Sequence, residues 1–283
     1  MASSYLNIVT FLLTTLFYYL ALKPSLTYET FSDPTKMKDY TKSNYMYLAI
    51  YLLLVMVIQF IVNASIISTT CGGSISENMG AAGVFTFLPW TLIFGVLVLV
   101  LTVYPGFKSA FSDVIGYFYV SSSANKLITE LLIDKDVQNK IDADGTMTAE
   151  QKEAMQSAAD TIIKICGNTS ILINQIVPEN FNDYWKILTP LMKNQYQNNS
   201  PETLDKKNDL FELVVTRDNV GEAMWYMYTG LLLTSIVQLK ITTRGCASNP
   251  KTMQKNYQKF LEEEAEAKAT QEKSTSTTYT ITA

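Results

Sequence analysis

Three long stretches of this chain carry no charged side chain at neutral pH, and they limit what the chain can fold into. Residues 1–22, 44–76 and 78–107 contain no Asp, Glu, Lys or Arg, and they hold the longest apolar runs of the 283-residue sequence. A helix needs about 20 mainly apolar residues to cross the roughly 30 Å hydrocarbon core of a bilayer. These stretches therefore predict a membrane protein rather than one large globular domain.

The fold class that we predict is an all-α membrane protein with three transmembrane helices, at about residues 5–22, 45–68 and 84–104, within a transmembrane region 1–107. The first segment could instead be a secretory signal peptide. No basic residue precedes it, however, and no small-x-small cleavage pattern follows it, so we interpret it as an uncleaved anchor. Pro105 and Gly106 are expected to end the third helix.

Residues 108–222 are predicted to form a small soluble helical domain. Residues 105–223 carry 11 basic and 17 acidic side chains, a balance of −6. Ser121–Ser123 is expected to cap one helix, and Ser200 with Pro201 is expected to begin another, because Ser is a favoured N-cap and Pro a favoured first helical residue. Thr148 is expected to begin a third helix through a capping box.

Residues 223–239 are the main ambiguity. They contain no charge but include several Thr, Ser and Gly residues, so their length permits a buried helix, an interfacial helix or a fourth span. We favour a buried or membrane-surface helix, because a span would place the lysine-rich tail 240–283 outside. This tail is predicted to be a charged helix that ends in a disordered segment.

Lysines flank the spans unevenly, which predicts an orientation. Loop 23–44 contains four lysines, loop 69–83 contains no basic residue, and Lys108 follows the third span. Cytoplasmic loops carry an excess of Lys and Arg. The N-terminus and loop 69–83 are therefore expected outside, with loop 23–44 and the soluble domain in the cytoplasm.

The composition removes most catalytic and metal-binding interpretations. The chain has no His, and its three cysteines lie far apart without the spacing of a zinc or iron–sulfur site. Glycine-rich phosphate-binding motifs and basic clusters are also absent, so we expect no enzyme activity, no cofactor or metal and no nucleic-acid partner. Cys71 and Cys246 both lie beside glycine near the end of an apolar segment. They form a disulfide or remain free thiols, according to the compartment that they face.

Residues 85–117 contain Pro89-Trp90, Phe94-Gly95, Pro105-Gly106, Phe111-Ser112 and Gly116-Tyr117. With this punctuation the stretch resembles a membrane protein family of nucleocytoplasmic large DNA viruses, which include algal and amoebal giant viruses. The family pattern combines an aromatic-Pro-Trp start, Phe-Gly within the helix, Phe-Pro-Gly-Trp, Pro-Phe-Ser-Asn and Gly-Tyr. Phe107, Ala110 and Asp113 depart from it, at positions where the family has Trp, Pro and Asn. Cys71-Gly72-Gly73 and residues 225–246 add to the resemblance. The membrane-interface motif comprises Pro89, Trp90, Phe94, Gly95, Pro105, Gly106, Phe107, Lys108, Phe111, Gly116 and Tyr117.

The resemblance implies a structural minor capsid protein that anchors the internal viral bilayer to the icosahedral shell. Its partners would be the lipid bilayer, the major jelly-roll capsid protein, other minor capsid proteins and a second copy of itself. It would reside in the virion membrane beneath the capsid, and in host endoplasmic-reticulum membrane during assembly. Phe107 and Phe111 would then lie beside lipid headgroups, with Lys108 near anionic lipid. A channel or transporter subunit is the alternative, and a membrane enzyme that uses Asp, Lys or Tyr is a third hypothesis.

Overall fold

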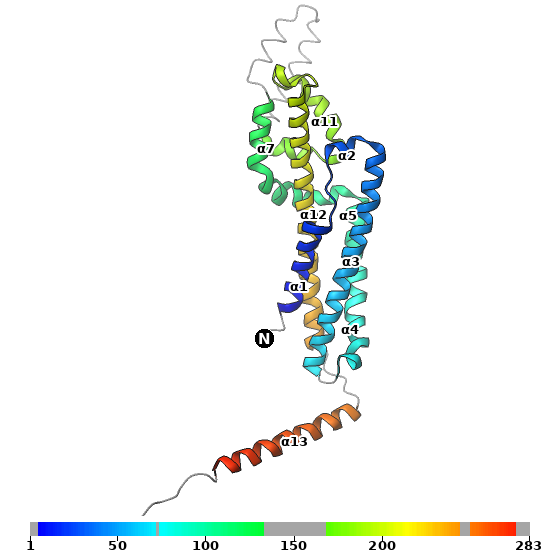
Figure 1. Ribbon diagram of the computed structural model, residues 1–283, viewed down its shortest axis with the longest axis vertical. Coiled ribbons are helices and arrows are strands. Elements are labelled where there is room, and N and C mark those ends of the chain that lie inside the picture. The colour runs from blue at the N-terminus through cyan, green and yellow to red at the C-terminus, as the bar shows by residue number, and fades with distance from the viewer. Residues whose placement is uncertain (1–4, 72–73, 133–167, 244–249, 276–283) are drawn as a thin grey trace, which may run out of the picture.

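The computed structural model describes the chain except residues 1–4, 72–73, 133–167, 244–249 and 276–283 (Figure 1). The described residues form helices and connecting loops without a β-strand, which confirms the predicted all-α class. The helix expected at Thr148, as well as Cys166 and Cys246, lies outside the described residues.

One half of the molecule is an elongated helical bundle (Figure 1). Its interior contains large aromatic and aliphatic side chains from all of its helices, among them Phe11, Tyr51, Trp90, Tyr226 and Leu233. The bundle consists of α1 (Leu6–Phe17), η2 (Tyr18–Leu22), α3 (Pro34–Cys71), α4 (Ile75–Pro89), η3 (Trp90–Gly95), α5 (Val96–Val103) and the second half of α12 (Pro201–Thr243).

Two helices are long and apolar enough to cross a membrane, Pro34–Cys71 and the continuous helix Ile75–Val103. They contain most or all of the second and third predicted spans. The first predicted span forms a shorter apolar helix, Leu6–Leu22. As expected from Pro105, the helix of the third span ends at Val103 and the backbone leaves the helical conformation at Tyr104.

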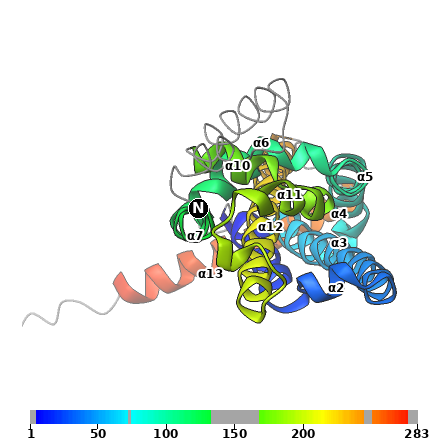
Figure 2. The same cartoon turned by 90° about the horizontal axis from the view of Figure 1, so that it is seen from above.

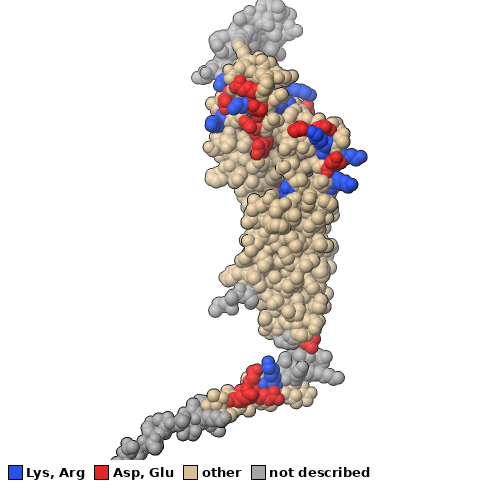
Figure 3. Space-filling view, viewed as in Figure 1, with Lys and Arg blue, Asp and Glu red and all other residues tan. Residues whose placement is uncertain are grey.

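The outer surface of the bundle is apolar. Charged side chains gather at the two ends of the molecule, and the bundle between them shows none on the face in view (Figure 3). The large exposed apolar side chains on its helices include Leu13, Leu20, Leu53, Ile61, Leu92, Leu99, Leu232 and Ile236. Such a surface is typical of contact with lipid rather than water.

The other half of the molecule, which we call the head, has a separate hydrophobic core. Its buried side chains include Leu127, Ile173, Phe181, Phe211 and Val214. The head consists of α2 (Tyr28–Ser32), η4 (Pro105–Lys108), α6 (Ser109–Phe111), η5 (Ser112–Gly116), α7 (Tyr117–Leu131), α10 (Thr169–Gln175), η6 (Pro178–Asn180), α11 (Phe181–Leu188), η7 (Thr189–Leu191), η8 (Asn194–Tyr196) and the first half of α12.

Helix α12 belongs to both halves. Its 43 residues begin at Pro201, and the Ser200 hydroxyl accepts a hydrogen bond from the Thr203 amide at 3.2 Å, as predicted for a cap. Seen along the long axis, α12 lies between α7 and the α3–α5 side of the molecule (Figure 2). Residues 223–239 therefore continue the head helix into the bundle. Beyond them lies α13 (Pro250–Thr275), at the end opposite the head (Figure 1).

The predicted cap at Ser121–Ser123 is wrong. These serines lie inside α7, and the chain is helical from Pro105 onward through η4, α6 and η5. The Ser121 hydroxyl donates to the Phe118 carbonyl at 3.0 Å, a bond that a helical serine makes to the preceding turn. Serine is therefore compatible with the helix interior here.

Candidate functional site

Four charged side chains meet where the head joins the bundle, and we call them the junction cluster. The ammonium of Lys108 contacts the carboxylates of Asp218 at 3.0 Å and Glu222 at 2.9 Å. The ammonium of Lys23 contacts the other oxygen of Glu222. Two cations thus balance two anions, and all four side chains are at most 16% exposed.

Three separate chain segments supply the junction cluster. Asp218 and Glu222 lie one turn apart on α12, so both carboxylates occupy one face of that helix. Lys23 follows the end of η2, and Lys108 is the last residue of η4. The hydroxyl of Tyr19 also donates to Glu222, at 3.0 Å. The cluster therefore ties the first bundle helix and the 105–108 turn to α12.

Lys108, which the sequence analysis places near anionic lipid, forms ion pairs within the protein. Its side chain is 15% exposed and its ammonium contacts two carboxylates of the same chain. The sequence analysis missed this because the acidic partners lie more than 100 residues away.

Burial and charge pairing compete in setting the pKa values of the cluster. Burial alone would raise the pKa of Glu222, but the attraction of Lys23 and Lys108 outweighs burial and lowers this pKa to about 2. Burial alone would lower the pKa of Lys108, yet Glu222 and Asp218 raise it above its ordinary value. For Lys23, burial outweighs the attraction of Glu222 and lowers the pKa. We infer that Glu222 and Lys108 are ionised at neutral pH.

Close beside the cluster, η5 crosses α12 with almost no space between the backbones. A Cβ atom on Gly116 would lie 2.4 Å from the carbonyl oxygen of Arg217, and one on Gly221 would lie 2.6 Å from the Cβ of Ser112. Only glycine fits at these two positions without movement of the backbone. Gly116, a residue of the predicted motif, therefore acts in helix packing.

The expectation that Trp90 lies at the membrane interface is wrong. Trp90 and Phe94 are fully buried in the bundle, where their rings pack together and against Phe11. Pro89 has no amide proton to donate, and the helix continues past it as the π-helical turn Trp90–Gly95. This part of the motif thus shapes the interior of the bundle.

The second part of the motif contacts the other stretch named in the resemblance. The indole of Trp225 donates to the carbonyl of Phe107 at 2.9 Å, and its ring meets that of Phe111 edge-on at 4.9 Å. Phe107 itself is 56% exposed at the end of the bundle. Pro105 and Gly106 are exposed, and Tyr117 packs partly against the head core.

A network of hydrogen bonds between polar side chains joins α1, α3, α4 and α12. The Asn7 side chain donates to Asn63 at 2.9 Å and to Gln238 at 3.1 Å, and Asn63 donates to Thr86 at 2.9 Å. Gln59 donates to the Asn7 carbonyl at 3.0 Å. Gln59 and Asn63 therefore bond to neighbouring helices. Such bonds are a common means of helix association in membranes.

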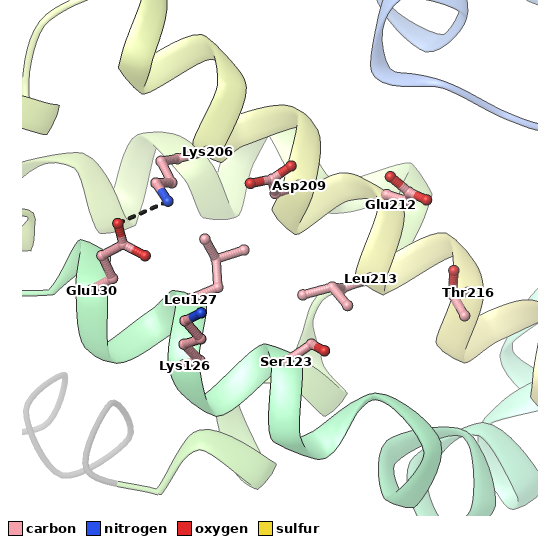
Figure 4. Close-up of a pocket in the computed structure, with 9 residues that line it drawn as sticks. All are labelled: Ser123, Lys126, Leu127, Glu130, Lys206, Asp209, Glu212, Leu213 and Thr216. Atoms are coloured by element: carbon pink, nitrogen blue, oxygen red, sulfur yellow. Dashed lines mark ion pairs between the residues drawn. The ribbon is translucent and has the colours of Figure 1, made fainter.

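The head carries an open groove between α7 and α12 (Figure 4). Its volume is about 390 Å³, with Leu127 and Leu213 among charged side chains of both signs. Lys206 pairs with Glu130 across it at 2.8 Å, and Asp209 points into it from α12 (Figure 4).

Cys71, at the end of the bundle opposite the head, is disulfide-bonded, and both other cysteines lie outside the described residues. Among the described residues, no group of three or more potential metal ligands comes together. Comparison with protein-family models, with curated proteins and with solved structures finds no match to the chain.

Proposed function

We propose that this chain is a structural minor capsid protein of a large DNA virus, which anchors the internal virion bilayer to the capsid shell. The viral assignment rests on the resemblance of residues 85–117 and 225–246. The anchoring role rests on the division of the chain into an apolar bundle and a charged head. The proposed mechanism is non-enzymatic and consists of membrane insertion plus protein contacts.

The observation that carries this proposal is the continuity of α12. One helix contributes to the bundle core and to the head core, and the junction cluster fixes it to two other segments at the boundary. A head attached in this way cannot swivel on a loose linker. This is the property that a connection between a membrane and a rigid shell requires.

We further propose that four helices cross the bilayer. Leu6–Leu22 and residues 223–243 pack beside the two long apolar helices, and at 1.5 Å per residue they reach about 25 and 31 Å. The head would face the cytoplasm, where the shell assembles. The disulfide at Cys71 supports this orientation, because disulfides persist in the oxidising compartment on the other side.

Lysine-directed crosslinking of intact virions, read out by mass spectrometry, tests the proposal. The head lysines Lys126, Lys186 and Lys206 are expected to link to a jelly-roll capsid protein. Lys268, which is exposed on α13 beyond the other end of the bundle, is the control and is expected to give no link to the shell. Absence of the protein from particles, or links from the head only to cellular membrane proteins, would contradict the proposal.

The alternative of a channel or transporter subunit gains no support from the described part of the bundle. Its polar side chains bond to one another, and large aromatic rings fill the interior. Reconstituted proteoliposomes are expected to show no solute or ion flux above that of empty liposomes.

A further inference from the structure

A cavity of about 200 Å³ lies beside the junction cluster, and its lining combines charged and apolar side chains. All four side chains of the cluster line it. Leu48 and Leu101, which are buried in the bundle core, line it as well. The half-exposed Tyr45 also lines it, so the cavity reaches the outer surface of the bundle. Charged and apolar side chains in one lining match the two parts of a lipid.

The charged part of the lining favours a ligand that carries both signs of charge. Lys23 and Lys108 provide positive charge, whereas Asp218, Glu222 and the exposed Glu179 provide negative charge. A purely anionic headgroup would meet three carboxylates there. A purely cationic one would meet two ammonium groups. A zwitterionic headgroup places its phosphate and its amine beside opposite charges.

One buried acceptor in the lining has no donor among the described residues. It is the side-chain oxygen Oδ1 of Asn44, on α3 one turn before Leu48. Buried polar atoms are nearly always hydrogen-bonded, so an atom left over in a cavity lining indicates a missing donor. A primary ammonium supplies three N–H donors, whereas the quaternary ammonium of choline supplies none.

We propose that this cavity binds the headgroup of a phospholipid with a primary amine, of the phosphatidylethanolamine type. The ammonium would donate to Asn44, the phosphate would lie toward the two lysines, and an acyl chain would leave toward the bilayer past the half-exposed Tyr45. This inference rests on the proposed membrane anchoring, since it assumes that headgroups lie at the level of the junction.

The test uses the delipidated full-length protein in detergent, with native mass spectrometry and thermal unfolding as readouts. The probes are phosphatidylethanolamine and its mono-, di- and trimethylated forms, which lose N–H donors stepwise at constant acyl chain. We expect the affinity to fall about tenfold or more from the primary to the quaternary amine, the loss typical of a charged hydrogen bond. Equal affinity across this series would overturn the proposal, and so would a preference for phosphatidylglycerol.

Two further comparisons locate the site and identify the source of the headgroup. Asn44→Leu is expected to abolish the preference, whereas Asn208→Leu, the same change at an exposed position of the head, should retain it. Glycerophosphoethanolamine lacks acyl chains and is expected to bind at least tenfold more weakly than the lipid. Equal affinity for the two compounds would show that the site binds a soluble ligand rather than a lipid. Resistance to carbonate extraction tests membrane anchoring separately, so an integrated protein without lipid preference would contradict only the lipid site.

Discussion

Glu222 is the residue on which the junction depends most. It accepts from Lys23, Lys108 and Tyr19, which belong to segments separated from it by more than 100 residues of sequence. The sequence alone marks this glutamate only as the last charge before an uncharged stretch. Its partners could not be predicted, because neither hydrophobic periodicity nor local capping patterns report which distant charges meet. Gln59 and Asn63 differ in this respect, because an uncharged polar pair within an apolar run has few possible partners besides another helix.

Removal of the Glu222 charge is expected to destabilise the protein strongly. Glu222→Gln leaves two lysines without their shared carboxylate in a mostly buried site, and breaking a buried pair typically costs about 3–5 kcal/mol. Glu29→Gln is the matched control, because Glu29 is 79% exposed and pairs only with Lys36 at the surface. Unfolding in detergent by increasing SDS measures both. Similar stability losses in the two variants would contradict this role of the junction cluster.

Low pH is expected to weaken the ion pairs of Glu222. The pKa of Glu222 is about 2 in the folded protein and 4.5 for an ordinary glutamate, so the ionised form stabilises the fold above pH 4.5. This stabilisation declines as the pH falls below 4.5 and is lost as the pH passes through about 2. The difference in stability between the native protein and Glu222→Gln, measured from pH 7 to pH 3, should therefore shrink. A difference independent of pH would show that the carboxylate charge is not responsible.

At the scale of elements, the apolar runs predict the helices of the bundle well, but not where these helices begin and end. The third span is part of a longer helix that starts at Ile75, and residues 105–131 form nearly continuous helix, although the sequence predicts that a helix begins at a cap in Ser121–Ser123. Both differences arise because tertiary packing stabilises turns that local propensity leaves undecided. The crossing of η5 and α12 at Gly116 and Gly221 is a packing effect of this kind.

Replacement of a helical glycine by alanine usually stabilises a protein, but at the crossing of η5 and α12 it is expected to destabilise it. Gly116→Ala places a methyl group against the backbone of Arg217 and should destabilise the protein by about 1–3 kcal/mol, the usual cost of overpacking. Gly80→Ala, in α4 with open space around it, should instead stabilise it by about 0.5–1 kcal/mol. Thermal unfolding of the two variants in one detergent gives the comparison. A stabilised Gly116→Ala variant would disprove the tight crossing.

At the scale of the whole molecule, the sequence predicts an apolar region and an acidic helical region but not how α12 joins them. The sequence leaves residues 223–239 ambiguous because of their hydroxyl groups, and it favours a buried or surface helix because a span would place the lysine-rich tail outside. In the structure, Thr234 is buried and Ser235 donates to the Leu231 carbonyl at 2.7 Å, so these hydroxyls are accommodated within the helix. Composition alone could not decide this, because it depends on which neighbours the helix has.

Glycosylation in endoplasmic-reticulum membranes tests the side on which each end lies. Gln258→Thr creates an Asn-Tyr-Thr acceptor at Asn256 in α13, and we expect this variant to be glycosylated because its tail would lie in the lumen. The natural acceptors Asn168 and Asn198 belong to the head and should stay unmodified. A mass shift removed by endoglycosidase is the readout, and Gln258→Ala is the control. Modification of the Gln258→Ala protein, or none of the Gln258→Thr variant, would contradict the proposed four crossings.

The uninterrupted length of α12 has a further consequence. At 1.5 Å per residue its 43 residues extend about 65 Å, of which the 22 in the head account for about 33 Å. Because a straight helix has a fixed length, α12 would set the distance between a bilayer and the layer bound to the head. Inserting or deleting whole helical turns in the head part of α12 would change that distance in steps of about 5.4 Å.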